Sequence, residues 1–327
     1  MREKIVEATN LVKWFPLRTG LLSSLIKKEL FVKAVDDINF DIYTGEIFGL
    51  AGESGSGKTT TGKLLIRLIE ITGGKIVFKG DDITSLPEAK FKPLRRKLQI
   101  IFQDPYESLN PRMTINDIIS EPLRVHGISD EREITKRMNR VLEDVKLTPP
   151  DEFLFRYPHE LSGGQRQRVA VARAIILSPE FIVADEPVSM LDVSIRAEVL
   201  NLILELREKY NVSFLFITHD LALARHICDR IAIMYLGKIV EMGSTEDVIK
   251  DSLHPYTKAL IKAVPVPDPT ARRAEVVIKG EIPSPVNPPL GCHFHTRCPS
   301  YIGDICRTKE PPLKELKKKH YVACHLY

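Results

Sequence analysis

The sequence is most constrained by a loop motif, G-x-x-x-x-G-K-[ST], that lies between a strand pattern and a helix pattern. The apolar segment 46–51 reads as a short buried strand, and apolar residues after the loop recur on one helical face. Glycines let such a loop turn its backbone N–H groups toward phosphate oxygens, and the helix adds the positive end of its dipole. A turn that binds nothing is the alternative, but the context favours a nucleoside triphosphate site. The loop residues are Gly52, Glu53, Ser54, Gly55, Ser56, Gly57, Lys58, Thr59 and Thr60, and the helical face is Leu64, Leu65, Leu68 and Ile69.

Two segments carry groups suited to phosphate chemistry. In the loop, Lys58 can reach the outer phosphates and the Thr59 hydroxyl can ligate Mg²⁺. A second segment is an apolar run, 181–184, that ends in Asp185 and Glu186, as expected of a buried parallel strand that delivers carboxylates to a site. We expect Asp185 to hold Mg²⁺ through water and Glu186 to orient or deprotonate the attacking water. The carboxylate pair alone is a weak indication of a nucleotide site, because many strands end in acidic residues. Together with the loop it becomes a strong one.

Composition limits the class of protein. The 327 residues suit one large domain, or one domain with an appendage, and a hydrophobic fraction of 43% allows a full core. The sequence contains no run of about 18 apolar residues, the length of a membrane span, and its first residues have no apolar signal region, so export is not expected. The 47 basic and 43 acidic residues are too evenly balanced to indicate nucleic acid as the main partner.

The remainder of the chain alternates strand and helix patterns. Strands are expected over 4–12, 31–41, 75–80, 98–103 and 212–218. The segment 104–162 has a helical character, with Thr114 as an N-cap and an apolar face within 131–146. An amphipathic stretch around Leu21–Leu30 suits a solvated surface helix better than a membrane or partner contact. His219 follows the strand 212–218, at the edge where α/β sheets bind ligands, although capping or core packing is the commoner role.

The pentapeptide Leu161-Ser162-Gly163-Gly164-Gln165 opens a helix over 165–177 and forms a second anion receptor. Because one triphosphate does not need two anion receptors, the second receptor suits the nucleotide of a partner subunit. At this motif the sequence resembles the ATPases of ABC transporters, over roughly residues 4–250. In that family two subunits bind head to tail and enclose two ATP molecules.

The resemblance implies an α/β fold: a P-loop NTPase (ABC ATPase) core with an antiparallel β subdomain and a helical signature subdomain, plus a small cysteine-rich C-terminal extension. It places an ATP-binding domain at 1–250, with the helical subdomain at about 104–162. The extension then covers 251–327 and begins with a proline-rich linker.

The resemblance also assigns roles to single residues. Gln103 is similar to the Q-loop glutamine that senses Mg²⁺ and water, and His219 to the switch histidine that contacts the γ-phosphate. Ser189–Asp192 is similar to the D-loop, with Met190 where alanine is more usual, and Asp192 joins the nucleotide-site residues. Phe15 is similar to the aromatic residue that stacks on adenine. Adjacent Trp14 is the second candidate, and core packing is the alternative for both.

Five cysteines are unevenly distributed, with Cys228 alone and the others within residues 292–327. In a chain without a signal peptide, this cluster favours metal ligation over disulfides. The spacing of Cys292, Cys298, Cys306 and Cys324 lacks the C-x₂-C pairs of common zinc ribbons and ferredoxins, so it does not choose between zinc and an iron–sulfur cluster. Unliganded thiols are the remaining alternative.

Segments 103–113 and 254–260 resemble the dipeptide/oligopeptide permeases, in particular the second of their two ATPases. That resemblance favours a [4Fe–4S] cluster at the four cysteines. It further implies ATP and Mg²⁺ as cofactors and a location on the cytoplasmic face of the cell membrane. The implied partners are a second, different ABC ATPase subunit, two membrane permease subunits and, indirectly, an extracytoplasmic substrate-binding protein.

The expected function is therefore that of an ATP-hydrolysing motor subunit of a peptide importer. Oligosaccharide or nickel uptake by the same motor remains open. A soluble ABC ATPase acting on DNA or ribosomes is disfavoured, because the sequence shows no tandem cassette, long coiled coil or basic arm. A regulatory module without activity would be expected to lack Glu186 or His219, and both are present.

Overall fold

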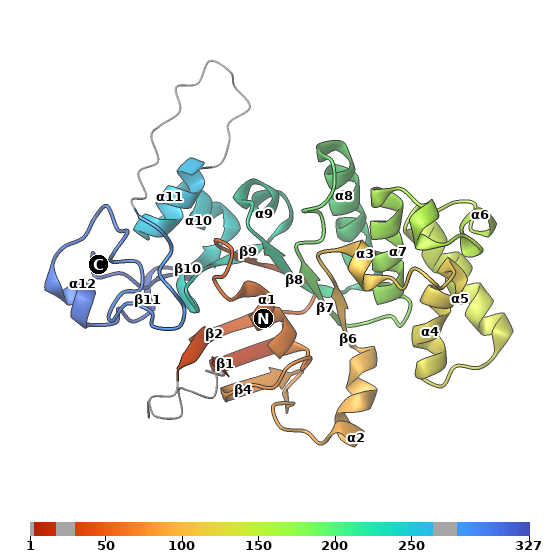
Figure 1. Cartoon of the computed structure of the whole chain (residues 1–327), viewed down its shortest axis with the longest axis horizontal. Coiled ribbons are helices and arrows are strands. Elements are labelled where there is room, and N and C mark those ends of the chain that lie inside the picture. Colours follow the sequence, from red (N-terminus) through yellow and green to blue (C-terminus); the bar gives the residue numbers. More distant parts are fainter. Residues whose placement is uncertain (1–2, 18–29, 264–279) are drawn as a thin grey trace, which may run out of the picture. The chain divides into compact units, whose positions relative to one another are not determined.

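The computed structural model describes residues 3–17, 30–263 and 280–327, and the chain divides into two compact units (Figure 1). The first unit comprises Met1–Ile5, Ile42–Ile47 and Ser85–Ile217, and the second comprises Val6–Asp41, Phe48–Thr84 and Thr218–Tyr327. The amphipathic stretch expected around Leu21–Leu30 lies outside the described residues, except for Leu30, and so does the first part of the proline-rich linker.

The first unit contains three parallel strands in the order β8-β7-β6. These are β6 (Leu98–Ile101), β7 (Phe181–Asp185) and β8 (Ser213–Thr218). Every residue of β7 and β8 is buried, as expected for strands of a parallel sheet that is covered on both faces. The register pairs Ile101 with Ala184 and Asp185 with Ile217. The carboxyl ends of the three strands therefore lie at one edge.

The helices of this unit follow the predicted capping and apolar patterns. The Thr114 hydroxyl accepts a hydrogen bond of 3.2 Å from the Asp117 N–H, while the Asp117 carboxylate accepts one of 3.3 Å from the Thr114 N–H. This capping box confirms Thr114 as an N-cap. In Figure 1, α4, α5 and α7 lie together, and they contact one another. The helices are α2 (Glu88–Phe91), α3 (Pro105–Ser108), α4 (Ile115–Val125), α5 (Glu131–Asp144), α6 (Asp151–Leu154), α7 (Gly163–Ile175) and α8 (Val193–Tyr210).

The second unit contains a four-stranded sheet in the order β2-β1-β4-β5, in which β4 pairs antiparallel with both β1 and β5. It also contains strands in the order β11-β12-β10-β9-β3. There β3 and β9 are parallel, and the other three pairs are antiparallel. The strands are β1 (Lys4–Pro16), β2 (Phe31–Tyr43), β3 (Ile47–Ala51), β4 (Gly73–Phe78), β5 (Asp81–Asp82), β9 (Arg230–Tyr235), β10 (Lys238–Ser244), β11 (Lys314–Lys317) and β12 (His320–Val322).

The structure does not support the small cysteine-rich C-terminal extension that the resemblance implies, because the C-terminal residues belong to the second unit. Strand β12 pairs with β10, and β11 pairs with β12, so these residues extend a sheet of the second unit. The buried Glu241 carboxylate of β10 accepts hydrogen bonds from the Leu253 N–H, the His254 N–H and Nε2 of His320. Glu241 and His320 are buried, and the distance of 2.8 Å between Glu241 Oε1 and His320 Nε2 fixes β12 to β10.

Helix α1 (Lys58–Leu65) ends earlier than the apolar pattern predicted, so Leu68 and Ile69 lie beyond it. Arg67 adopts a left-handed conformation with φ of 51°. The Arg67 N–H donates to the Leu64 carbonyl, and the Leu68 N–H donates to the Lys63 carbonyl, both at 2.9 Å. This pattern is a Schellman motif, which satisfies the last carbonyls of the helix and stops it.

The other helices of the second unit are short. They are α9 (Leu221–Ile227), α10 (Thr245–Lys250), α11 (Pro255–Ala263) and α12 (Asp304–Thr308). Within residues 3–17, 30–263 and 280–327, none of the helices combines the length and apolar character that crossing a bilayer requires.

Candidate functional site

In the second unit, the phosphate-binding motif forms the turn between β3 and α1, as predicted. Gly57 has φ of 105°, and a Cβ built on it would lie 2.1 Å from the Ala34 carbonyl oxygen, so only glycine fits there. The buried Lys58 ammonium donates hydrogen bonds to the carbonyls of Gly52 at 2.8 Å and Glu53 at 2.9 Å. The lysine is therefore folded over the loop, with its charge at the centre of the turn.

The rest of the phosphate loop has one side exposed to solvent and the other side packed against the protein. Ser54 and Gly55 at its tip are exposed, whereas Ser56 is buried. The Ser56 carbonyl accepts a hydrogen bond of 2.9 Å from the Gly237 N–H, which ties the loop to the β9–β10 turn. Thr59 and Thr60, in the first turn of α1, are half-buried. A hydroxyl and several backbone N–H groups at a helix start can bind Mg²⁺ and phosphate oxygens.

In the first unit, Gln103 and Glu186 lie together beyond the ends of β6 and β7. The Gln103 side-chain Nε2 donates a hydrogen bond of 3.4 Å to Glu186 Oε2. Glu186 has φ of 46°, a left-handed conformation uncommon for a residue other than glycine, and its N–H donates to the Ile217 carbonyl at 3.0 Å. Such strain clusters at functional sites. Asp185 is 4% exposed at the end of β7, where its carboxylate suits a cation.

The second anion receptor begins α7 in the same unit. The Ser162 hydroxyl accepts a hydrogen bond from the Gln165 N–H at 3.3 Å, and Gln165 Oε1 accepts one from the Ser162 N–H at 2.9 Å. The first N–H groups of a helix have no partner within it, so Gly163 and Gly164 can offer theirs to an anion. A Cβ on Gly164 would lie 2.6 Å from Ile195 Cγ2, which places α7 close to the first turn of α8.

The segment Ser189–Asp192 leads into that turn. Arg196 of α8 donates hydrogen bonds to the carbonyls of Leu191 at 2.7 Å and Ser189 at 3.3 Å. Asp192 is the N-cap residue of α8, and Met190 is 63% exposed. The arginine holds this loop in a fixed conformation, while its Met190 side chain faces solvent.

The two aromatic candidates for adenine stacking differ in their contacts. Trp14 donates from Nε1 to Asp36 Oδ1 at 3.0 Å, and the Lys33 ammonium lies 4.4 Å from its ring. Phe15 is 37% exposed, with the Lys13 ammonium 4.9 Å from its ring. The Trp14 side chain is hydrogen-bonded within the second unit, whereas Phe15 is exposed and its ring contacts Lys13.

The predicted ATP-site residues thus form local groups. The second unit holds the phosphate loop, Phe15 and His219, which is exposed directly after β8. The first unit brings Gln103 together with Glu186, and it brings the Ser162–Gln165 receptor close to α8.

The four C-terminal cysteines are near enough to influence one another electrostatically. Burial raises the pKa of the Cys292 thiol to about 12, and the charges of Cys324, Cys298 and Cys306 add to this shift. Burial also raises the pKa of Cys298 and Cys324. These shifts favour the neutral thiols when no metal is bound, so a metal would have to displace their protons. In the part of the chain that the structure describes, no group of three or more His, Cys, Asp or Glu side chains is placed to hold a metal ion.

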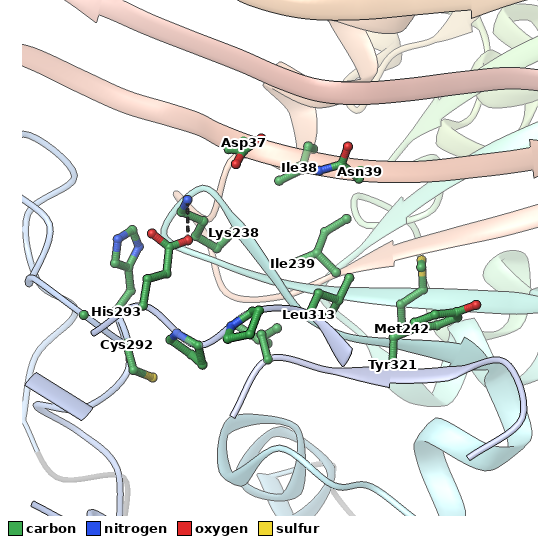
Figure 2. A pocket seen from close by; sticks show the side chains of 16 residues that line it. Asp37, Ile38, Asn39, Lys238, Ile239, Met242, Cys292, His293, Leu313 and Tyr321 are labelled. Carbon is green, nitrogen blue, oxygen red and sulfur yellow. Dashed lines mark ion pairs between the residues drawn. The ribbon is translucent and has the colours of Figure 1, made fainter. Parts of the chain in front are cut away.

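A cavity of about 530 Å³ lies in the second unit, and none of its lining residues belongs to the phosphate loop (Figure 2). It is lined by β2, by the β9–β10 hairpin and by the C-terminal segment, including Cys292 and His293. Two of its charged groups form an ion pair: the Lys238 ammonium lies 2.6 Å from Glu310 Oε1, as the dashed line in Figure 2 marks. His293 Nδ1 lies 2.9 Å from the Leu236 carbonyl oxygen.

Two further residues contact the phosphate loop and were missed from the sequence. Arg297 forms an ion pair with Glu53, and the Tyr256 hydroxyl accepts a hydrogen bond from the Glu53 N–H. Arg297 lies 244 residues from Glu53 in the chain. Tyr256 belongs to the segment 254–260 that carries the resemblance, but that segment gave no indication of a contact with the loop. The acidic side chain within the loop was the one available signal that a cation would lie nearby.

Comparison with known proteins identifies the family. The model of the ABC transporter family matches residues 35–189, and that of the oligopeptide/dipeptide transporter C-terminal region matches residues 240–306. The oligopeptide transport ATP-binding protein AppF of Bacillus subtilis is 49% identical over 329 residues, which cover 100% of this chain and 98% of AppF.

Solved structures agree with this relationship. A dimeric ATP-binding cassette, in a post-hydrolysis state bound to ADP and phosphate, is 28% identical with a TM-score of 0.64 and covers 74% of this chain and 99% of its own. A nucleotide-free cassette from an ABC transporter is 26% identical with a TM-score of 0.64. The match covers 79% of this chain and 98% of the cassette. The chain therefore belongs to the ATP-binding proteins of ABC transporters, has the P-loop ABC ATPase fold, and is an ATP hydrolase that carries the C-terminal region of the oligopeptide/dipeptide transporters.

Proposed function

We propose that this chain is the motor subunit of a peptide importer, in which ATP binding and hydrolysis drive transport through membrane permease subunits. The observation that carries the proposal is that one chain holds both the ABC transporter region and the oligopeptide/dipeptide C-terminal region. The name of the Bacillus subtilis relative supports a peptide cargo. In this account the functional division is an ATP-binding part at 1–250, with a helical subdomain at about 104–162, and a family-specific region at 251–327.

We assign the ATP chemistry to residues in four groups. The phosphate loop binds the triphosphate of ATP, with Lys58 on its outer phosphates, and Phe15 stacks on adenine. Glu186 orients and deprotonates the attacking water, with Gln103 holding the carboxylate and His219 contacting the γ-phosphate. The Ser162–Gln165 receptor and Asp192 bind the nucleotide of the opposing ATPase subunit.

Mg²⁺ fits the oxygen donors assigned to it. Thr59 offers a hydroxyl, Gln103 an amide oxygen and Asp185 a buried carboxylate, and Mg²⁺ prefers such ligands together with water and substrate phosphates. When bound, the ion neutralises charge on the phosphate oxygens.

The partners follow from the second anion receptor. We infer a head-to-tail pair with a second, different ABC ATPase, bound to two permease subunits on the cytoplasmic face of the membrane and served by an extracytoplasmic binding protein. The dimeric state of a solved relative supports this arrangement. The isolated chain should then hydrolyse ATP poorly and be mostly monomeric by light scattering. Full, uncooperative activity of a dilute monomer would contradict the inference.

For the C-terminal region we propose a [4Fe–4S] cluster with a structural role, held by Cys292, Cys298, Cys306 and Cys324, with zinc as the alternative. The support is that four of the five cysteines fall within residues 292–324, where their side chains are near enough to influence one another electrostatically. Cluster binding requires the four side chains to draw closer together than they lie here.

Reconstitution tests the cargo. The assembled transporter, in liposomes containing ATP, should take up radiolabelled di- or oligopeptides in the presence of its binding protein, and Lys58→Ala should abolish uptake. Uptake of an oligosaccharide or of Ni²⁺ instead, with peptides excluded, would keep the motor role and contradict the peptide assignment.

A further inference from the structure

Glu53, the second residue of the phosphate loop, is held by two groups from the C-terminal third of the chain. Arg297 Nη1 donates to Glu53 Oε2 at 2.8 Å, and Arg297 Nη2 donates to Glu53 Oε1 at 3.2 Å. The Tyr256 hydroxyl accepts a hydrogen bond of 2.9 Å from the Glu53 N–H. The side chains of Arg297 and Glu53 are 8% and 23% exposed, so this bidentate pair is partly shielded from water and is stronger than a surface ion pair.

The Arg297 side chain is itself fixed in place. Its Nη1 also donates to the Tyr235 hydroxyl at 3.3 Å, and its guanidinium lies 5.8 Å from the centre of the Tyr235 ring. The preceding turn is anchored by Phe294, which is 1% exposed and has its ring centre 5.2 Å from those of both Tyr235 and Tyr256. An arginine held in this way loses little conformational entropy when it pairs with Glu53.

The charge of Glu53 makes the pair consequential for ATP. Glu53 is a carboxylate in the loop that receives a triphosphate of several negative charges, and an unpaired carboxylate there would repel it. The Glu53 carbonyl also accepts the Lys58 hydrogen bond. One residue therefore connects the lysine of the loop with the arginine of the C-terminal region.

We propose that Arg297 is a positioning residue of the ATP site: through Glu53 it fixes the first turn of the phosphate loop and cancels its negative charge. The C-terminal region, which is characteristic of oligopeptide/dipeptide transporters, then also influences the affinity for ATP. The inference rests on the proposed ATP site and adds to it a residue that does not touch the nucleotide.

The test measures ATP affinity with a fluorescent analogue, and the KM and kcat of hydrolysis, in the assembled transporter. Arg297→Gln should raise Kd and KM about tenfold with kcat little changed, because an uncompensated charge is left beside the phosphates. Arg297→Lys, which keeps the charge but loses the bidentate geometry, should lower the affinity for ATP about threefold. Glu53→Gln combined with Arg297→Gln should bind ATP more tightly than Arg297→Gln alone, a rescue that a purely structural defect would not show.

Arg307 provides a matched control, since it is an exposed arginine of the same region that pairs with Asp304 at 3.0 Å. Arg307→Gln should bind ATP like the wild type. Wild-type affinity in Arg297→Gln, or no rescue in the double variant, would overturn the inference. If Arg297→Gln does not fold, wild-type affinity in Arg297→Lys would overturn it. Loss of ATP binding in the wild type, or normal binding in Lys58→Ala, would instead contradict the proposed ATP site.

Discussion

Gln103 and Glu186 are 83 residues apart in the chain, yet the Gln103 amide donates a hydrogen bond of 3.4 Å to the Glu186 carboxylate. Glu186 is also fixed through its backbone, because its N–H donates to the Ile217 carbonyl at 3.0 Å and its φ of 46° restricts it to a strained conformation. A proposed base that is held by its side chain and its backbone is oriented before water binds. Such preorganisation favours proton transfer.

Removal of the Gln103 amide should therefore slow hydrolysis more than it weakens ATP binding. We expect Gln103→Ala to lower kcat about tenfold, since it removes one orienting contact and leaves the base itself. Gln99 is a suitable control: it lies in β6, the strand that leads to Gln103, and its side chain donates to the Arg95 carbonyl instead. Equal losses of kcat in Gln103→Ala and Gln99→Ala would show that the effect comes from the strand.

Phe15→Ala should weaken ATP and GTP binding to a similar extent, because stacking on an aromatic ring discriminates poorly between purines. By the magnitude of base–aromatic stacking, the loss should be about 1–3 kcal/mol. Trp14→Ala should mainly lower the melting temperature, since Trp14 bonds Asp36 and contacts Lys33. Nucleotide titrations that find wild-type affinity in Phe15→Ala and weak binding in a folded Trp14→Ala protein would reverse the assignment.

His254 should make the second unit less stable at acid pH. Burial lowers the pKa of His254 to about 4 from its ordinary value of 6.5; Lys258 adds to this effect and Glu241 opposes it. The unfolded chain therefore binds the proton at higher pH than the folded chain. The contribution of neutral His254 is complete above about pH 6.5 and is lost as pH falls toward 4, by about 1.4 kcal/mol per pH unit.

Urea denaturation of the wild type and of His254→Gln at pH 7 and pH 5 measures this contribution. The free energy of unfolding of the wild type should fall more between the two pH values than that of the variant, by about 2 kcal/mol. The comparison cancels other titrating groups, such as His293, whose pKa is also lowered by burial. Parallel pH dependences would show that His254 titrates normally.

The cysteine site predicts a coloured protein. Anaerobically purified wild-type protein should be brown and contain about four irons and four sulfides per chain, the stoichiometry of a cubane cluster. Cys306→Ser should lose the colour, whereas Cys228→Ser, at the buried cysteine outside the cluster, should keep it. Stoichiometric zinc without iron would show that the four cysteines bind zinc rather than an iron–sulfur cluster. A C-terminal region that resists protease with no metal bound would rule out a structural metal.

The local parts of the molecule could be predicted from the sequence because their signals are local. The Thr114 cap and the phosphate loop each lie within a few residues, and the structure has both. The end of α1 was missed because its left-handed residue is Arg67 rather than glycine, the usual signal. Strands β11 and β12 were missed because they have four and three residues, and every residue of β11 is exposed.

Long-range pairing accounts for the remaining differences. The Arg297–Glu53 and His320–Glu241 contacts join residues 244 and 79 positions apart. Nothing in the local sequence around Arg297 or His320 indicates an acidic partner. Their burial depends on how the C-terminal residues pack onto β9 and β10, which only the tertiary structure shows.

The central claim is that this chain hydrolyses ATP with Glu186 as the general base, and Glu186→Gln in the assembled transporter tests it most directly. Steady-state ATP hydrolysis should fall by about 10²-fold or more, because the amide cannot accept the proton of the attacking water. ATP should still bind with nearly wild-type affinity, since the phosphate loop is unchanged. Unchanged hydrolysis in this variant would contradict the assigned role of Glu186 and with it the proposed mechanism.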